Sequence, residues 1–358
     1  MKKAIAMLLS ATIIFSLAAC GSTGKNTASE DSAPTAGQES ESASDSGNEK
    51  SDSSETGSNA DADSAEAEKP ETILINSVNA ESEKIQLEVP YDPQRIVVID
   101  MACLDILTSL GLEDRIVGTA STSLDYLVDY VKDVPVVGTI KSPDLEAIME
   151  CEPDLIFMGG RGAEYYETLS EIAPTVRVIT DVDLGLVESV TVHSKEIASV
   201  FGLEDEIDAK VAGFGERIDA LREFASGKTM ILGMCTSGSF NVMGDDGRCS
   251  IIGTEVGFTN IGVKDDVDTA THGNEASFEY IVQMNPEYIF VMDRDAAIGT
   301  DGAQLAKDIM ENELVQSTDC YKNGNLIILE HPAVWYTGEG GITALDLMIQ
   351  DLETALLK

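Results

Sequence analysis

A pattern of apolar and polar positions occurs twice in this chain. Residues 144–161 read DLEAIMECEPDLIFMGGR and residues 277–294 read SFEYIVQMNPEYIFVMDR, aligned without a gap at an offset of 277 − 144 = 133. In each copy a short helical stretch ends just before a proline, which disfavours helix in the residue that precedes it. An unbroken apolar run follows, as expected for a strand buried on both faces. Each copy therefore predicts a helix followed by a buried strand.

Both copies end on an arginine that lies beyond the predicted strand, Arg161 and Arg294. In open α/β sheets, ligands bind at the carboxyl ends of the strands. The duplication therefore predicts two related α/β lobes that each aim one arginine at a shared crevice. Taken singly, either arginine could instead be a surface residue at a strand end.

Strands alternate with helices from residue 72 onward, which indicates mostly parallel sheets and an α/β fold. The segment 204–226 lies between the two copies and has apolar residues at helical spacing. It predicts one long amphipathic helix, weakened locally by Gly213 and Gly215, that joins a lobe over 72–203 to a lobe over 227–358. A single helix should restrain hinge motion more than extended strands would.

The amino-terminal part of the chain reads as a targeting segment and a linker. Lys2 and Lys3 precede an apolar stretch, residues 4–16, that is too short to span a bilayer comfortably. Residues 17–21, LAACG, resemble a bacterial lipobox, which implies that segment 1–19 is removed and Cys20 is lipidated; an ordinary cleaved signal is the alternative. Residues 20–71 have no aromatic residue and are rich in acidic residues, Ser, Ala and Gly, so we expect a disordered acidic tether.

Charge and motif content limit the possible functions. The formal net charge of −41 argues against binding to nucleic acid or to anionic lipid by electrostatic attraction. The sequence has no HExxH, GxSxG or P-loop motif, and no catalytic constellation emerges. We therefore expect a binding protein rather than an enzyme. In so acidic a chain, arginines that converge on one crevice are stronger evidence for an anionic ligand than they would be in a basic protein.

The predicted organisation resembles the substrate-binding proteins of ABC importers for iron–siderophores, haem and cobalamin. Within that class, the order of several phrases over about residues 90–358 is similar to the catecholate branch, which includes petrobactin and enterobactin-type receptors. These phrases are Gly160-Arg161, EIAPT at 171–175, THG at 271–273 before SFEYI at 277–281, DRDAA at 293–297 and VWY at 334–336.

The resemblance implies a helical-backbone periplasmic-binding-protein fold with two Rossmann-like lobes. It also implies a monomer held by its lipid at the outer face of a bacterial cell membrane. The implied partners are a ferric siderophore, carried as transported ligand rather than as intrinsic cofactor, and a permease dimer with its ATPase subunits. A haem or corrinoid receptor of the same fold is the second reading. An exported metalloenzyme is the third.

In the catecholate branch, arginines in the cleft contact the anionic chelate. Arg161 and Arg294 match those positions, and Arg248 lies where a third arginine is expected, although its neighbouring residues depart from the family phrase. The chemistry agrees, because a buried anion needs paired cations and the guanidinium is a planar, permanently charged donor.

The resemblance also implies that His272 and Tyr336 complete the iron shell when the siderophore supplies only four donors. Ferric iron favours oxygen donors and accepts imidazole. Either residue could instead have a local structural role, as a helix cap or in the core. Trp335 could stack on a catechol ring or anchor the core. His331, beyond the last predicted strand, could compete as a ligand, whereas His193 lies within a helix and is expected to be structural or exposed.

Glu146 and Glu279 occupy the same place in the two copies, in the first turn of each predicted helix. The resemblance implies that they meet arginines of the permease subunits; stabilisation of the helix N-terminus is the alternative. The cysteines other than Cys20 show no zinc-like spacing. A Cys235–Cys249 disulfide is one option for them.

Overall fold

The computed structural model describes residues 69–181, 183–263 and 273–357, which fall within one compact unit spanning residues 66–358. The predicted signal segment, Cys20, nearly all of the acidic linker and His272 lie outside the described residues. Within the described ranges, no helix combines the length and apolar character needed to cross a membrane.

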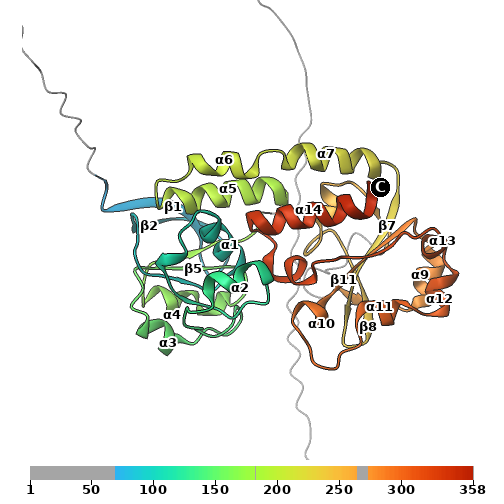
Figure 1. Ribbon diagram of the computed structural model, residues 1–358, viewed down its shortest axis with the longest axis horizontal. Helices are drawn as coiled ribbons and strands as arrows, with labels where there is room; N and C mark the ends of the chain where they lie inside the picture. Colours follow the sequence, from blue (N-terminus) through green and yellow to red (C-terminus); the bar gives the residue numbers. More distant parts are fainter. Residues whose placement is uncertain (1–68, 182, 264–272, 358) are drawn as a thin grey trace, which may run out of the picture. The chain divides into compact units, whose positions relative to one another are not determined.

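The first lobe, drawn in blue to yellow-green in Figure 1, is built on a four-stranded parallel sheet with the order β4-β3-β5-β6. Every residue of β3 and β5 is buried, as expected for a parallel sheet covered on both faces. An antiparallel hairpin, β1–β2, precedes the sheet. The elements are β1 (Thr72–Val78), β2 (Lys84–Pro90), β3 (Ile96–Val98), α1 (Met101–Ser109), η1 (Glu113–Arg115), β4 (Ile116–Thr119), α2 (Asp125–Val131), α3 (Leu145–Glu150), β5 (Leu155–Met158), η2 (Ala163–Tyr165), α4 (Tyr166–Ser170), β6 (Thr175–Arg177) and α5 (Leu186–Ser199).

The second lobe has a mixed sheet with the order β10-β8-β7-β11-β12, and β9 pairs with the start of β7. β7, β9, β11 and β12 are parallel to one another, whereas β8 returns antiparallel to β7. The α/β fold class is thus confirmed. The elements are β7 (Thr229–Thr236), β8 (Ser239–Met243), α8 (Ile251–Thr254), β9 (Thr259–Asn260), β10 (Asn274–Glu275), α9 (Phe278–Met284), β11 (Tyr288–Asp293), α10 (Arg294–Ala297), α11 (Ala306–Met310), α12 (Glu313–Ser317), α13 (Asp319–Lys322), β12 (Leu326–Ile328), η3 (Val334–Gly338) and α14 (Ile342–Leu356).

The sequence repeat is also a structural repeat. α3–β5 and α9–β11 are the same helix–strand unit, and a side chain caps each helix, Asp144 in the first copy and Ser277 in the second. The residues before the two prolines, Glu152 and Asn285, have φ angles of 46° and 42° and are equivalent, since 152 + 133 = 285. This left-handed conformation is uncommon for non-glycine residues, so its recurrence shows that both copies leave the helix in the same way.

The central strands of the second lobe place alternate residues in two different cores. In β7, Met230 and Leu232 face a large core, while Ile231 faces a smaller one; in β11, Phe290 and Val291 divide in the same way. The large core also contains the strands of the first lobe and the buried faces of α7 and α14. The two lobes therefore share one continuous apolar core along the side where these helices lie.

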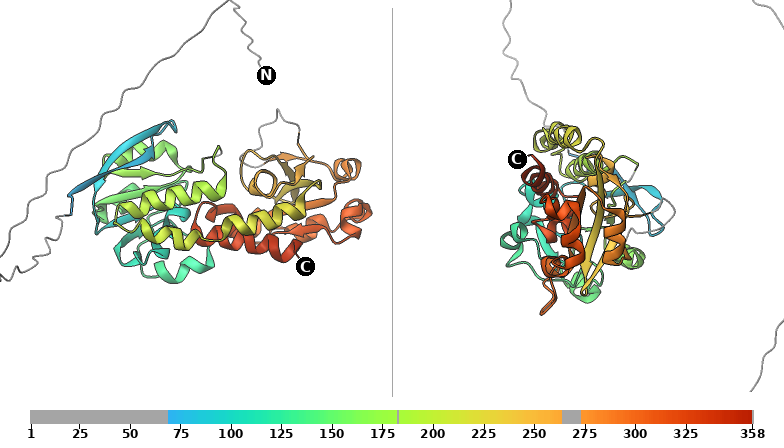
Figure 2. Two further views of the ribbon diagram at one scale, coloured as in Figure 1. Left: turned by 90° about the horizontal axis from the view of Figure 1, so that it is seen from above. Right: turned by 90° about the vertical axis from the view of Figure 1, so that its right-hand side faces the viewer.

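The connection between the lobes differs from the one predicted. Residues 204–226 form two helices, α6 (Asp205–Val211) and α7 (Phe214–Ala225), because the chain leaves helical geometry at Ala212 and Gly213 has a φ of 88°. Gly215 is accommodated within α7. A second element strengthens the connection, since α14 packs against α7 and against α1 and α5 of the first lobe (Figures 1 and 2).

Asp105 of α1 fixes the start of α14 to the first lobe. Its buried carboxylate accepts hydrogen bonds from the backbone N–H groups of Thr343 at 3.1 Å and Ala344 at 2.8 Å, and from the hydroxyl of Tyr126 at 2.9 Å. A Cβ at Gly341 would lie 2.3 Å from this carboxylate, so glycine is needed there. The helix N-terminus is thus capped by a residue of the other lobe, which limits how far the lobes can separate.

Candidate ligand-binding site

The short π-helix η3 places two neighbouring aromatic residues in different environments. Trp335 is fully buried, and its indole N–H donates to the carboxylate of Asp351 on α14 at 2.8 Å. The predicted contact between Trp335 and a ligand is therefore wrong, because the ring is enclosed by the core and its N–H already has a hydrogen-bond partner. Tyr336, the next residue, faces the crevice between the lobes instead.

Three guanidinium groups surround the ring of Tyr336. The Cζ atoms of Arg161, Arg248 and Arg294 lie 5.2, 4.8 and 5.5 Å from its centroid, within the range of cation–π attraction. Arg161 and Arg294 follow β5 and β11, so each copy of the repeat contributes one arginine, as the pattern predicts. The structure brings these four residues together, and their contact with a ligand stays a prediction.

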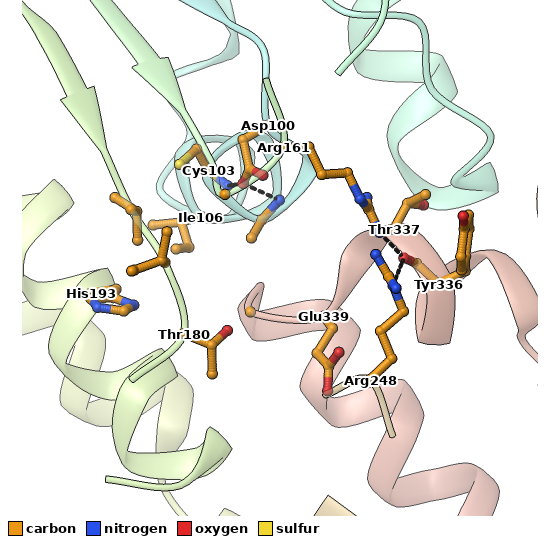
Figure 3. A pocket seen from close by; sticks show the side chains of 15 residues that line it. Asp100, Cys103, Ile106, Arg161, Thr180, His193, Arg248, Tyr336, Thr337 and Glu339 are labelled. Carbon is orange, nitrogen blue, oxygen red and sulfur yellow. Dashed lines mark hydrogen bonds between the residues drawn. The ribbon is translucent and has the colours of Figure 1, made fainter. Parts of the chain in front are cut away.

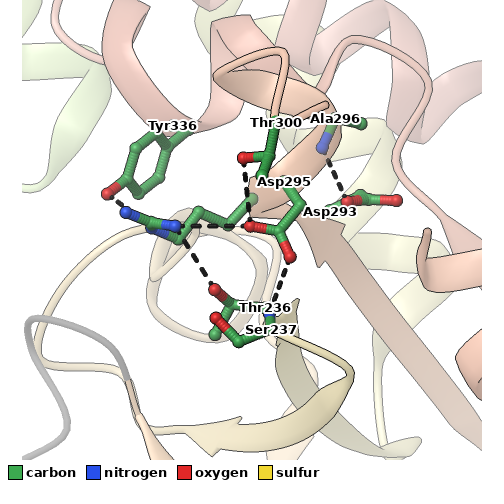
Figure 4. A network of polar contacts seen from close by, with 8 residues as sticks. Thr236, Ser237, Asp293, Asp295, Ala296, Thr300 and Tyr336 are labelled. Carbon is green, nitrogen blue, oxygen red and sulfur yellow. Dashed lines mark hydrogen bonds and ion pairs between the residues drawn. The ribbon is translucent and has the colours of Figure 1, made fainter. Parts of the chain in front are cut away.

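Hydrogen bonds hold the guanidinium groups in place around Tyr336. Arg161 Nη2 donates to its carbonyl oxygen at 2.5 Å and Arg248 Nε to the same atom at 3.3 Å, while Arg294 Nε donates to the phenolic oxygen at 3.1 Å. Arg294 also contacts the buried carboxylate of Asp295 at 3.4 Å (Figure 4). Arg161, by contrast, forms no ion pair with a carboxylate among the described residues, although the negative charges of Asp100 and Glu339 act on it from a greater distance.

The electrostatics of the site follow from this arrangement. Burial, followed by the positive charge of Arg248, lowers the pKa of Arg161. Burial by itself would raise the pKa of Tyr336, but the hydrogen bond from Arg294 and the three positive charges outweigh it and hold the pKa below 10.0. The site therefore favours an anion, including the phenolate form of Tyr336 itself.

A cavity of about 190 Å³ opens beside these residues (Figure 3). Arg161, Arg248 and Tyr336 line one part of it, together with Asp100. Asp100 caps α1 through the N–H groups of Ala102 and Cys103. A Cβ at Gly159 would lie 2.0 Å from the Asp100 carboxylate, so glycine lets the end of β5 approach α1 and brings the Arg161 backbone to the cavity.

Glu339 adds a second carboxyl group to this cavity. Burial raises the pKa of Glu339 to about 7, although Arg248, the Cys249 backbone N–H and Arg161 act in the opposite direction. A group with this pKa exchanges its proton near neutral pH. The cavity thus holds a carboxyl whose charge changes in the physiological range, close to cations whose charges do not.

The three histidines have separate outcomes. His272 lies outside the described residues, and its role as an iron ligand stays a prediction. His331 Nδ1 lies 2.6 Å from Asp351, and His331 is not among the residues that line the cavity. His193, expected to be structural or exposed, lines the cavity instead. Helical spacing contains the signal for this, because His193 is three residues after the buried Val190 and four before the buried Ile197 on α5.

The described cysteines, five in number, are all buried and free, so the optional Cys235–Cys249 disulfide is not formed. They are small core residues.

Two lobes, a shared cavity and a cluster of cations define a ligand-binding protein. The chain belongs to the family described as "Periplasmic binding protein", which matches residues 96–333. This confirms the resemblance found in the sequence, and the family consists of substrate-binding proteins.

Individual relatives are consistent with this assignment. The chain is 31% identical over 286 residues to the petrobactin-binding protein YclQ of Bacillus subtilis, covering 79% of this chain and 88% of the relative. The crystal structure of YclQ superposes with a TM-score of 0.72 at 30% identity, covering 80% of this chain and 99% of that structure. The periplasmic catecholate-siderophore binding protein VctP of Vibrio cholerae gives a TM-score of 0.71 at 30% identity, covering 79% and 100%.

Proposed function

We propose that this protein is the extracytoplasmic receptor of an ABC importer and binds a ferric catecholate-type siderophore in the cavity between its lobes. The observation that carries the proposal is the cluster of three guanidinium groups around Tyr336 in a chain of net charge −41. The names of YclQ and VctP, a petrobactin-binding and a catecholate-siderophore-binding protein, support this ligand class.

The ligand chemistry fits the site. A ferric bis-catecholate has a charge of 3 − 4 = −1 and a tris-catecholate 3 − 6 = −3, and burial of either anion requires cations. Guanidinium groups donate through a planar fork and keep their charge. A phenolate is an oxygen donor of the type that ferric iron prefers. Tyr336, with His272, would fill the two positions that a tetradentate chelate leaves open.

The proposal also covers the attachment of the protein to the membrane and the delivery of the siderophore to the permease. A lipid on Cys20 and the acidic linker would hold the protein at the outer face of the cell membrane. Glu146 and Glu279 are both exposed on the first turns of α3 and α9, one in each lobe. Two equivalent carboxylates can address a permease with two-fold symmetry. The receptor acts as a monomer, and iron enters it only with the transported chelate.

Equilibrium titration of the purified protein tests the proposed ligand class. Ferric bis-catecholate, haem and cobalamin are added separately, and the visible charge-transfer band and intrinsic fluorescence are followed. We expect saturable binding of one ferric bis-catecholate per protein and recovery of the ligand unchanged. Binding of haem or cobalamin in its place, or chemical conversion of the ligand, would overturn the proposal.

A further inference from the structure

A second cavity of about 420 Å³ lies beside the first. The β1–β2 hairpin, β6 with the loop after it, and α5 enclose this space, which we name the hairpin cavity. The lining residues Val178, Ile179, Thr180 and His193 belong to both cavities, so the two spaces are neighbours with these residues as their common border. Figure 3 shows Thr180 and His193 on the side of the first cavity away from Tyr336.

The wall of the hairpin cavity is largely apolar. Two of its residues, Leu184 in the loop and Val192 on α5, are 47% and 38% exposed although they are large aliphatic side chains. A bound apolar group would remove this surface from water, which is favourable. The aliphatic lining residues are Val78, Val176, Val178, Ile179, Leu184, Val192 and Ile197.

The cations near the hairpin cavity are already engaged. Buried Arg177 donates to the carbonyl oxygens of Gly159 at 3.2 Å and Asn79 at 2.5 Å, and to the Ser82 hydroxyl at 3.2 Å. Lys84 forms an ion pair of 2.8 Å with Asp181.

Asp183 and Glu196 add further acidic side chains to the lining. The hairpin cavity is therefore unsuited to an anion. It suits an uncharged or cationic group, in contrast to the arginine-lined cavity next to it.

His193 lies at the junction of the two cavities. Burial lowers the pKa of His193, and the positive charge of Lys84 acts in the same direction, whereas the negative charges of Asp181 and Glu196 oppose it. The imidazole is therefore neutral at neutral pH. A neutral imidazole presents one hydrogen-bond donor and one acceptor. With the Thr180 hydroxyl, it offers polar contacts to an amide or hydroxyl of a ligand at the border of the two cavities.

We propose that the hairpin cavity binds an apolar arm of the same ligand whose anionic head lies among the arginines. The inference rests on the proposed function and narrows its ligand class to amphipathic ferric chelates, with an aliphatic or aromatic arm that is uncharged or cationic. Each methylene group buried there contributes about a factor of four in affinity. An arm of several methylenes should therefore strengthen binding at least about tenfold.

The test uses two ferric bis-catecholate chelates with the same head, one of which has a hexyl arm on its linker. Titration of the wild-type protein should give a dissociation constant at least about tenfold lower for the chelate with the arm. Val192→Trp fills the hairpin cavity and should abolish this difference while leaving the armless chelate unaffected. Glu188→Trp is the matched control, because Glu188 is exposed on the same helix and lines neither cavity; it should retain the preference.

Leu184→Asp provides a second variant that places a charge in the apolar wall without filling it, and thermal melting checks that each variant is folded. Loss of the arm preference in Leu184→Asp supports the inference even if Val192→Trp fails to fold. Equal wild-type affinity for the two chelates, or a preference that survives in both folded variants, overturns the inference and leaves the proposed function intact. Failure of the armless chelate to bind overturns the proposed function, and the inference with it.

Discussion

Arg294 Nε donates a hydrogen bond of 3.1 Å to the phenolic oxygen of Tyr336. Arg294 begins α10 immediately after β11, whereas Tyr336 lies in η3, 42 residues further along the chain. The bond places a permanent positive charge beside a group that ionises, so it stabilises the phenolate. In the proposed iron site, this bond would favour an anionic oxygen as the donor to a ferric ion.

The first prediction concerns the ionisation of Tyr336. Because the arginines outweigh the effect of burial, its pKa lies below 10.0, and the phenolate should appear at lower pH than that of an ordinary tyrosine. Absorbance at 295 nm, measured as wild type minus Tyr336→Phe, isolates this one residue. A difference curve with its midpoint at or above pH 10 would show that the arginines do not stabilise the phenolate.

The same pKa determines how Tyr336 affects stability. Since its pKa is lowered by folding, the stabilising contribution is complete above the unfolded value near 10 and is lost as pH falls through the folded value. Below the folded pKa both states have a protonated phenol and the contribution is absent. The loss of unfolding free energy in Tyr336→Phe should therefore grow as the pH rises from the folded pKa to the unfolded value near 10.

The second prediction concerns the cationic cluster. Arg161→Ala and Arg294→Ala should each weaken binding of ferric bis-catecholate by about 2–5 kcal/mol, the scale for removing one partner of a buried charge pair. Lysine at either position should also weaken binding, because it lacks the planar fork. Arg222→Ala is the control, since its side chain is 52% exposed and Arg222 is not one of the three arginines around Tyr336. Normal affinity in both alanine variants would place the ligand elsewhere.

The third prediction concerns Glu339 and pH. Folding raises its pKa from 4.5 to about 7, so its contribution to stability is fully present below pH 4.5 and is lost as pH rises through about 7. Glu339→Gln keeps a neutral side chain at every pH. The stability of this variant relative to wild type should increase between pH 4.5 and 8, by an amount on the order of 3 kcal/mol.

Urea unfolding at several pH values measures this difference. Glu313→Gln, which changes an exposed glutamate on α12, is the matched control for the substitution itself. A stability difference between Glu339→Gln and wild type that stays constant over this range would mean that folding does not raise the pKa of Glu339.

The fourth prediction concerns delivery to the permease. Glu146→Ala combined with Glu279→Ala should leave folding and siderophore affinity nearly unchanged but abolish uptake by cells, and lysine should be worse than alanine because it adds repulsion. Glu150→Ala combined with Glu313→Ala removes the same charge from other exposed helical positions and should leave uptake intact. Normal uptake by the Glu146/Glu279 variant at wild-type protein levels would leave stabilisation of the two helices as the better explanation.

The sequence repeat made the two helix–strand units and their arginines predictable. In each copy the proline and the apolar run after it indicate a buried strand. The residue that follows such a strand lies at the carboxyl edge of the sheet, which accounts for the positions of Arg161 and Arg294. The directions of the side chains within η3 could not be predicted in this way. Trp335 and Tyr336 are neighbouring aromatic residues, and no local pattern shows which of them is buried. In the structure Trp335 is buried, and its indole N–H has a partner on another helix, Asp351 of α14.

Long-range partners explain the remaining differences. The apolar spacing of residues 204–226 continues through Ala212 and Gly213, so it predicts one helix. Gly213, which was expected only to weaken that helix, is where α6 and α7 separate. Asp105 caps the N-terminus of α14 through the N–H of Thr343, which lies 238 residues later, so no local pattern reveals this role. The hairpin cavity depends on how β1–β2 packs over β6 and α5, which no local pattern records.

We propose that Tyr336 ligates the iron of a tetradentate chelate within the arginine cluster. The most direct measurement compares the affinities of wild type and Tyr336→Phe for a tetradentate and a hexadentate ferric catecholate, with resonance Raman spectra of each complex. We predict a far larger loss for the tetradentate chelate, together with a tyrosinate–iron signal that is present in wild type and absent from Tyr336→Phe. Equal losses for the two chelates, with identical spectra from both proteins, would contradict the account.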